Sequence, residues 1–101
     1  MLETVNSKSD IPIRLTDERW AHIIEEHNEL AGMRRDILAT IGEPAKIVEG
    51  KDGERLAMHE IETGKYLVVV YREYENDGFI ITAFLTRRTK SLMKRKQIWP
   101  A

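Results

Sequence analysis

The sequence predicts an α+β domain in which N-terminal helices pack on an antiparallel β-sheet. Apolar residues recur at helical spacing within about residues 16–42, and the spacing changes to that of strands and hairpin turns within about residues 45–87. Gly42 and Pro44 separate the two parts, because glycine often follows the last turn of a helix and proline cannot continue it. Helices followed by strands at hairpin spacing are typical of an α+β fold with an antiparallel sheet.

The length and composition narrow the class of protein. A chain of 101 residues is enough for one domain and too short for two, so we predict a single domain over residues 1–101. Cysteine is absent, which excludes disulfides and thiolate metal sites. No apolar run approaches the roughly 20 residues that span a bilayer, and the first six residues lack the features of a signal peptide. We therefore expect a cytoplasmic protein with no membrane partner.

Two helices are expected before Pro44. Thr16 is a suitable N-cap for the first helix, which would run to about Leu30. One stripe of this helix carries Trp20, Ile23, Ile24, His27, Leu30 and Ala31. The second helix would run from Met33 to Ile41. Residues 1–10 are expected to be loose, and residues 11–15 to form a short extended segment at a sheet edge, where proline is tolerated.

Four strands are expected after Pro44, over residues 46–49, 55–61, 66–71 and 79–86. Turn sequences separate them, and the last turn, Asn76-Asp77-Gly78, is a strong hairpin signal. The near-continuous apolar run at 66–71 is typical of a central strand buried on both faces. Residues 89–98 fit either a short basic helix or an extension of the last strand, and Leu92, Met93, Ile98 and Trp99 would attach them to the body.

The net charge of −1 hides a strong asymmetry. Six of the sixteen basic residues lie within residues 86–101, and none of the seventeen acidic residues does. The first 85 residues therefore carry −7 and the last sixteen carry +6. This basic tail, residues 88–101 with Arg87 beside it, suggests a polyanionic or acidic partner. The alternative is a solvated terminal helix that pairs with acidic residues elsewhere on the fold.

The segment from His22 to His27 resembles a helical zinc motif, but its spacing is different. Such motifs place two histidines four residues apart, so that both project from one face of the helix. A separation of five residues places the rings about 140° apart. We therefore predict no metal site and no cofactor.

His27 is a more promising candidate because it lies on the apolar stripe and should point towards the sheet. Its imidazole fits either a buried structural group or an acid–base group, since histidine titrates near neutral pH. Arg72 and Thr82 are polar residues within or after apolar strand segments. Either they meet His27, or Arg72 is a strand-end residue and Thr82 an ordinary strand former. His59 has the same two interpretations: a second acid–base group or a surface cross-strand partner.

Several of these segments together resemble the barnase–EndoU–colicin–RelE superfamily of nucleases, and more narrowly its phage-associated branch. The resemblance covers about residues 11–87. It rests on the pattern Trp20-x-x-Ile23-x-x-x-His27 in the first helix and on the strand Gly78-Phe79-Ile80-Ile81-Thr82-Ala83-Phe84-x-Thr86-Arg87.

The resemblance implies a RelE- or barnase-like fold, with N-terminal helices on a four-stranded antiparallel sheet and a basic C-terminal tail. It also implies a toxin-like endoribonuclease that cleaves RNA without metal, by attack of the ribose 2′-hydroxyl on its own phosphate. Transferred to this sequence, the catalytic group would contain His27, Arg72, Thr82 and Thr86. Contacts to the substrate would come from Arg87, Arg88, His59 and Lys90.

The partner implied by the resemblance is RNA, free or bound to the ribosome, and a protein inhibitor or antitoxin could accompany it. Two alternatives remain at this point. One is a non-catalytic module of the same fold that binds RNA or an acidic protein through the basic tail. The other is an accessory protein of a phage or mobile element, in which the tail docks a partner.

Overall fold

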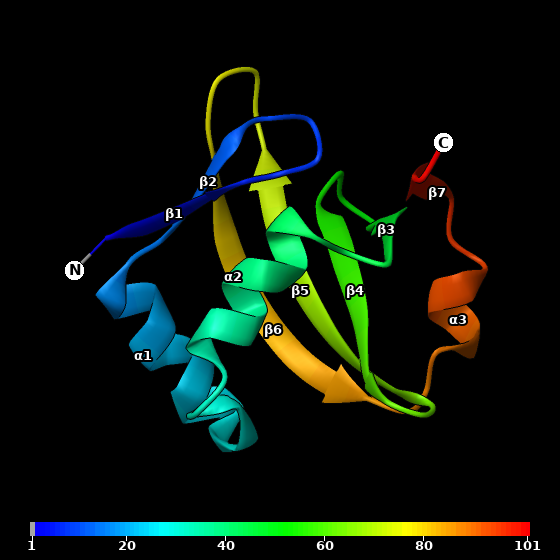
Figure 1. Ribbon diagram of the computed structural model, residues 1–101, viewed down its shortest axis with the longest axis horizontal. Helices are drawn as coiled ribbons and strands as arrows, with labels where there is room; N and C mark the ends of the chain where they lie inside the picture. The colour runs from blue at the N-terminus through cyan, green and yellow to red at the C-terminus, as the bar shows by residue number, and fades with distance from the viewer. Residues whose placement is uncertain (1) are drawn as a thin grey trace.

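The computed structural model describes residues 2–101, and this part of the chain folds into a curled β-sheet with helices on both of its sides (Figure 1). The helices are α1 (Asp17–Glu26), α2 (Arg34–Gly42) and α3 (Lys90–Met93), with a 3-10 turn, η1 (Asn28–Leu30), after α1. The strands are β1 (Glu3–Asn6), β2 (Pro12–Leu15), β3 (Lys46–Glu49), β4 (Arg55–Glu62), β5 (Lys65–Glu73), β6 (Gly78–Thr86) and β7 (Gln97–Trp99). The chain is therefore α+β, as predicted.

The prediction of a four-stranded antiparallel sheet is wrong. The sheet has seven strands in the order β1-β2-β6-β5-β4-β3-β7, and the pairing of β2 with β6 is parallel. The four strands expected after Pro44 form its antiparallel centre. The additional strands come from the two ends of the chain, and each of them has only three or four residues.

The N-terminal segment is ordered because it adds strands to the sheet. Residues expected to be loose form β1, which pairs antiparallel with β2 from Glu3 opposite Leu15 to Asn6 opposite Pro12. Strand β2 is not an edge strand, because its other side pairs with the start of β6. Gly78 permits this close approach, since a side chain there would overlap the Arg72 carbonyl oxygen and the Ile13 side chain.

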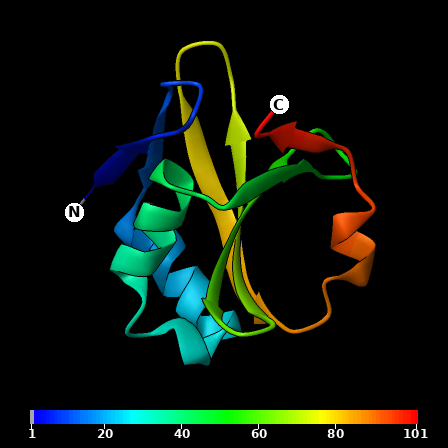
Figure 2. The same ribbon diagram turned by 45° about the vertical axis from the view of Figure 1, so that its right-hand side comes forward.

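The two faces of the sheet have different surroundings (Figure 2). The helix face lies under α1 and α2, and its strand side chains are the buried residues Ile47, Ala57, Leu67, Val69, Tyr71, Ile80 and Ala83. The tail face looks towards α3, and its side chains are Val48, Leu56, Met58, Tyr66, Val68, Val70 and Phe84. Alternation along β5 sends neighbouring side chains to opposite faces, so this central strand is buried from both sides.

The first helix begins as predicted but ends earlier. The Thr16 hydroxyl caps it by accepting a hydrogen bond from the Arg19 backbone N–H at 3.0 Å. The helix ends at Glu26 rather than at about Leu30, and His27 has φ −132° and ψ 71°, outside the helical region. The chain continues through η1 to α2, which lies within one residue of the predicted second helix at each end.

The basic tail contains the short helix that the sequence offered as one possibility, and within residues 2–101 it does not extend β6, which was the other possibility. Residues 90–93 form α3, whose Leu92 packs on the tail face. Residues 97–99 form β7, in which Trp99 lies opposite Ile47 of β3. Ile98 and Trp99 pack against the core, as expected, whereas Met93 is exposed. No helix within residues 2–101 is long and apolar enough to cross a membrane.

Candidate functional site

The His27 side chain lies at the outer edge of β6, where it meets Phe84. The ring centroids are 6.4 Å apart and the rings are tilted by 39°. The imidazole is about one third exposed, and its nearest carboxylate, that of Glu29, lies 3.9 Å from Nδ1, beyond hydrogen-bond distance. The His27 side chain is therefore not buried, and no hydrogen bond from residues 2–101 fixes it. Its position at the end of α1, outside the helix, allows its ring to reach the strand edge.

A row of polar and aromatic side chains runs along β6 on the tail face. Thr82, Phe84 and Thr86 alternate with inward residues and lie opposite Val70, Val68 and Tyr66 of β5. These side chains are half-buried, except for Val68, which is fully buried. The Thr82 hydroxyl makes no hydrogen bond within residues 2–101. The part of the tail face formed by β6 and the adjoining side of β5 is therefore a partly open surface with a free hydroxyl.

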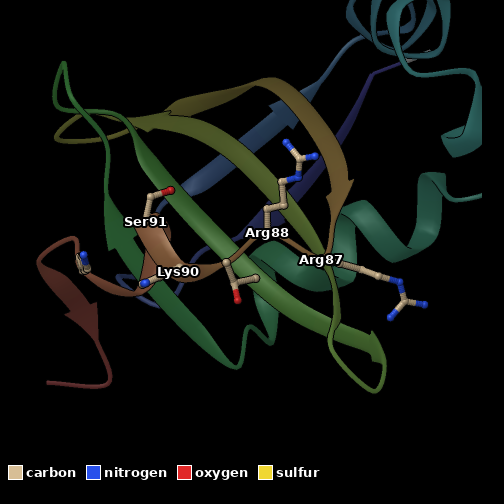
Figure 3. A pocket seen from close by; sticks show the side chains of 6 residues that line it. Arg87, Arg88, Lys90 and Ser91 are labelled. Carbon is tan, nitrogen blue, oxygen red and sulfur yellow. The ribbon is translucent and has the colours of Figure 1, made fainter.

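Thr86 is the last residue of β6, and its side chain stabilises the turn that contains Arg87 and Arg88. Its hydroxyl oxygen accepts a hydrogen bond from the Arg88 backbone N–H at 2.9 Å. The side chains of Arg87 and Arg88 point in different directions (Figure 3). Arg87 donates to the Thr63 carbonyl at 3.1 Å and pairs with Glu62 at 3.0 Å, on the β4–β5 turn. Thr86 and Arg87 are therefore both engaged in local structure.

A basic hollow of about 710 Å³ lies beside the end of β6 (Figure 3). Its walls are Arg87, Arg88, Thr89, Lys90, Ser91 and Lys94, without an acidic residue. Within residues 2–101 the side chains of Arg88, Lys90 and Lys94 make no ion pair or hydrogen bond. Three cationic groups are thus free at one end of the tail face, where they attract anions.

Arg72 lies on the tail face but is held away from His27. Its guanidinium donates a hydrogen bond to the Asp52 carbonyl oxygen at 2.8 Å, in the β3–β4 turn. It also lies close enough to Glu54 to contribute to the lowered pKa of that carboxyl, although hydrogen bonds from backbone N–H groups are the main cause. Val68 is the residue opposite Phe84, and Arg72 lies four residues further along β5, about 13 Å at strand spacing.

His59 lies on the other face of the sheet. It pairs with Leu67, whose side chain belongs to the core under the helices. Together with Asp36, Thr40 and Glu43 it lines a small pocket of about 140 Å³ against α2. The structure therefore separates His59 from Thr82 and Phe84 by the thickness of the sheet.

Of the residues proposed from the sequence, Thr82 and Thr86 lie on the tail face of β6, on either side of the Phe84 that His27 contacts. Arg87, Arg88 and Lys90 line the hollow beside the end of this strand, and Arg87 is also paired with Glu62. Arg72 and His59 lie elsewhere. His22 is exposed on α1, and within residues 2–101 no three histidine or acidic side chains are grouped as metal ligands would be.

Two features of this surface were not proposed from the sequence. The first is Phe84, whose ring contacts the His27 ring. The second is Lys94, which lines the basic hollow together with Arg88 and Lys90. Alternation along 79–86 already placed Phe84 between Thr82 and Thr86, which was a usable signal. The contact between Phe84 and His27 could not be predicted from the sequence, because it depends on the early end of α1. Comparison of the chain with protein-family models, curated proteins and solved structures finds no match in any of the three.

Proposed function

We propose that the protein is a metal-independent endoribonuclease. Its site would be the C-terminal half of β6, residues 82–86, on the tail face. One observation carries the proposal: a partly exposed imidazole without hydrogen bonds within residues 2–101 contacts an aromatic ring of β6, the strand whose end leads to a group of free cations. His27 and Phe84 provide the first two features, and the basic hollow provides the third. This combination offers an acid–base group, a stacking surface for a base and charges for phosphates.

The chemistry requires three contributions. A base removes the proton of the ribose 2′-hydroxyl, an acid protonates the leaving 5′-oxygen, and donors stabilise the charge on the phosphorane between these events. His27 can act as the base that accepts the 2′-hydroxyl proton, because its ring nitrogens are not occupied by hydrogen bonds within residues 2–101. Water supplies the proton that the leaving 5′-oxygen takes up. The free Thr82 hydroxyl can donate to a non-bridging phosphate oxygen.

We assign the binding of the reacting phosphate to Arg88 rather than to Arg72. The Arg72 guanidinium is engaged at the β3–β4 turn, whereas the Arg88 side chain has no partner within residues 2–101 and lies two residues after Thr86. A guanidinium can form two parallel hydrogen bonds to a phosphate, which suits it to this position. Lys90 and Lys94 would hold the neighbouring phosphates of the strand.

The test is cleavage of single-stranded RNA by the purified protein in the presence of EDTA. We expect fragments that end in a 2′,3′-cyclic phosphate, and no cleavage where the 2′-hydroxyl is replaced by hydrogen. His27→Ala should lower the cleavage rate by roughly 10²- to 10⁴-fold, the usual contribution of a general acid or base. Ribosome-bound RNA is assayed in parallel, because the substrate implied by the resemblance includes it.

His22→Ala is the matched control, because it removes an exposed histidine from the same helix without touching Phe84. It should cleave at the wild-type rate. Equal activity of the wild type and His27→Ala would contradict the catalytic assignment. Binding of RNA with no cleavage in either assay would favour the non-catalytic binding module instead.

A further inference from the structure

A second pocket lies at the other end of β6, where β2, β6 and the start of α1 meet. It has a volume of about 260 Å³ and is lined by Arg14, Thr16, Arg19, Phe79 and Ile80. We call it the corner pocket. It is separate from the basic hollow and from the His27 contact, and none of the roles proposed so far uses it.

The corner pocket combines cationic and aromatic groups. The Arg14 guanidinium lies over the Phe79 ring, 5.7 Å from its centroid, and the exposed Tyr74 ring lies 6.1 Å from the same ring. Arg14 also pairs with Asp77, and Arg19 donates to the Ile81 carbonyl oxygen. Each guanidinium has five N–H donors, so these bonds fix the two groups in place and leave donors for a ligand.

Two residues of the corner pocket share the tail face of the sheet with the proposed cleavage site. Phe79 is opposite Arg72, and Phe84 is opposite Val68, both on the tail face of β5. Arg14 pairs with Phe79 across the parallel β2–β6 contact and shares its face. A path therefore runs along β6 from Arg14 and Phe79, past Thr82 and Phe84, to the cations of the tail.

We propose that the corner pocket is a second nucleotide subsite and that the ligand is a single-stranded RNA lying along β6. This inference rests on the proposed function for the position of the cleaved phosphate. Seven residue steps separate Phe79 from Thr86, about 23 Å at strand spacing. Roughly four nucleotides cover such a path, which is at the lower end of single-strand binding sites.

The aromatic side chains on the path favour a single-stranded ligand over a duplex. Phe84 and the Phe79–Tyr74 pair offer ring surfaces, and base faces are available for stacking in a single strand but not inside a duplex. Arg14 and Arg19 would bind the phosphate of the nucleotide whose base stacks at the corner pocket. Arg88 would bind a phosphate at the other end of the RNA path along β6.

The experiment measures binding of fluorescent 2′-O-methyl oligonucleotides, which lack the nucleophile and cannot be cleaved by the proposed reaction. Two lengths are compared, a dinucleotide and a hexanucleotide, with the wild type and Arg14→Gln. The wild type should bind the hexanucleotide at least tenfold more tightly than the dinucleotide. Arg14→Gln should weaken hexanucleotide binding about tenfold, the scale of one charge-assisted hydrogen bond, and leave dinucleotide binding unchanged.

Salt dependence and two further variants make the test specific. Loss of one phosphate contact should reduce the slope of log affinity against log salt by about 0.7 for a single strand. Tyr74→Ser removes the exposed ring next to Phe79 of the corner pocket and should weaken only the hexanucleotide, by roughly fivefold. Arg35→Gln, at an exposed position of α2 away from the path, should change neither affinity.

The outcomes separate this inference from the proposed function. Equal effects of Arg14→Gln on both lengths, no effect on either, or the absence of binding would overturn the corner subsite. Binding of a duplex as tightly as of the hexanucleotide, with the same Arg14 dependence, would overturn the single-stranded ligand. Arg14-dependent hexanucleotide binding without any RNA cleavage would retain the subsite and remove the catalytic assignment.

Discussion

The two faces of the sheet are built from the same strands but serve different purposes. On the helix face, Leu67 and Val69 are fully buried under α2 and the core of apolar side chains. On the tail face, their neighbours Tyr66 and Val70 are half-buried, because the short helix α3 covers only the side near β3 and β4. The first face provides stability, and the second leaves an aromatic and polar surface available for a ligand.

The free positive charges are also unevenly distributed over the molecule. Free cations gather at the basic hollow beside the end of β6, and none of the residues lining this hollow is acidic. A weak net charge can therefore coexist with a local positive field that attracts anions.

The largest expected effect on stability comes from the helix face. Leu67→Ala removes a fully buried side chain and should lower the free energy of unfolding by roughly 2–5 kcal/mol. Val70→Ala, on the half-open face of the same strand, should cost only about 1 kcal/mol. Urea denaturation measures both. Equal losses would mean that the tail face is as closely packed as the helix face.

The next effect concerns RNA binding by the tail. Replacing Arg88, Lys90 and Lys94 together by glutamine removes three cations without ion-pair partners within residues 2–101. RNA affinity should fall roughly a hundredfold at low salt, and the salt slope should decrease by about 2. The free energy of unfolding should change by less than about 0.5 kcal/mol, because the removed groups support no contact.

Arg87→Gln is the matched control for the triple variant. It removes the neighbouring cation, which points towards Glu62 and the β4–β5 turn. RNA affinity should fall much less than in the triple variant, because this guanidinium is already paired with Glu62, while stability falls by up to about 1 kcal/mol, as for an exposed ion pair. A large loss of RNA binding by Arg87→Gln would place the RNA on the other side of the chain.

The third prediction concerns pH. Burial raises the pKa of Tyr71 to about 12, and the nearby Glu73 carboxylate adds to this shift. Between pH of about 10 and 12 the unfolded chain loses this proton while the folded protein keeps it, so stability falls as pH rises. The loss should be up to about 1.4 kcal/mol per pH unit.

Tyr71→Phe isolates this contribution. The Tyr71 hydroxyl is buried without a hydrogen-bond partner within residues 2–101. Its removal should therefore leave stability at neutral pH unchanged or slightly raised. Denaturation curves at pH 7 and 11 should show a smaller alkaline loss in the variant, and an identical loss in both proteins would assign the pH effect to other groups.

The smallest expected effect separates the two threonines of β6. Thr86→Val removes the hydroxyl that accepts the Arg88 N–H and should cost about 1 kcal/mol of stability. Thr82→Val removes a hydroxyl with no partner within residues 2–101 and should cost less than about 0.5 kcal/mol, while lowering RNA cleavage. Thermal unfolding and the cleavage assay together test this division of roles.

The sequence predicted the parts of the fold that local patterns determine. The change from helices to strands at Pro44, the cap at Thr16 and the hairpin at Asn76-Asp77-Gly78 all depend on residues close together in the chain. The parallel pairing of Ile13 with Gly78 joins segments 65 residues apart. The polar strand β1 is held by its pairing with β2 rather than by its own composition, so no local pattern indicated it.

The candidate site was predicted in part for the same reason. Alternation along β6 correctly placed Thr82 and Thr86 on one face, because that rule is local. The placement of Arg72 depended on which turn its long side chain would reach, and that of His59 on which face α2 would cover. His27 was assigned to a helix that ends one residue before it, and its contact with Phe84 follows from that early end.

We propose that RNA occupies the tail face beside His27. The most direct measurement is NMR mapping of backbone and side-chain signals during titration with a 2′-O-methyl hexanucleotide. We expect the largest shifts at His27, at Thr82 to Thr86 of β6, and at Arg88, with small shifts at His59 under α2. Shifts centred on His59 and α2, with β6 unaffected, would contradict the claim.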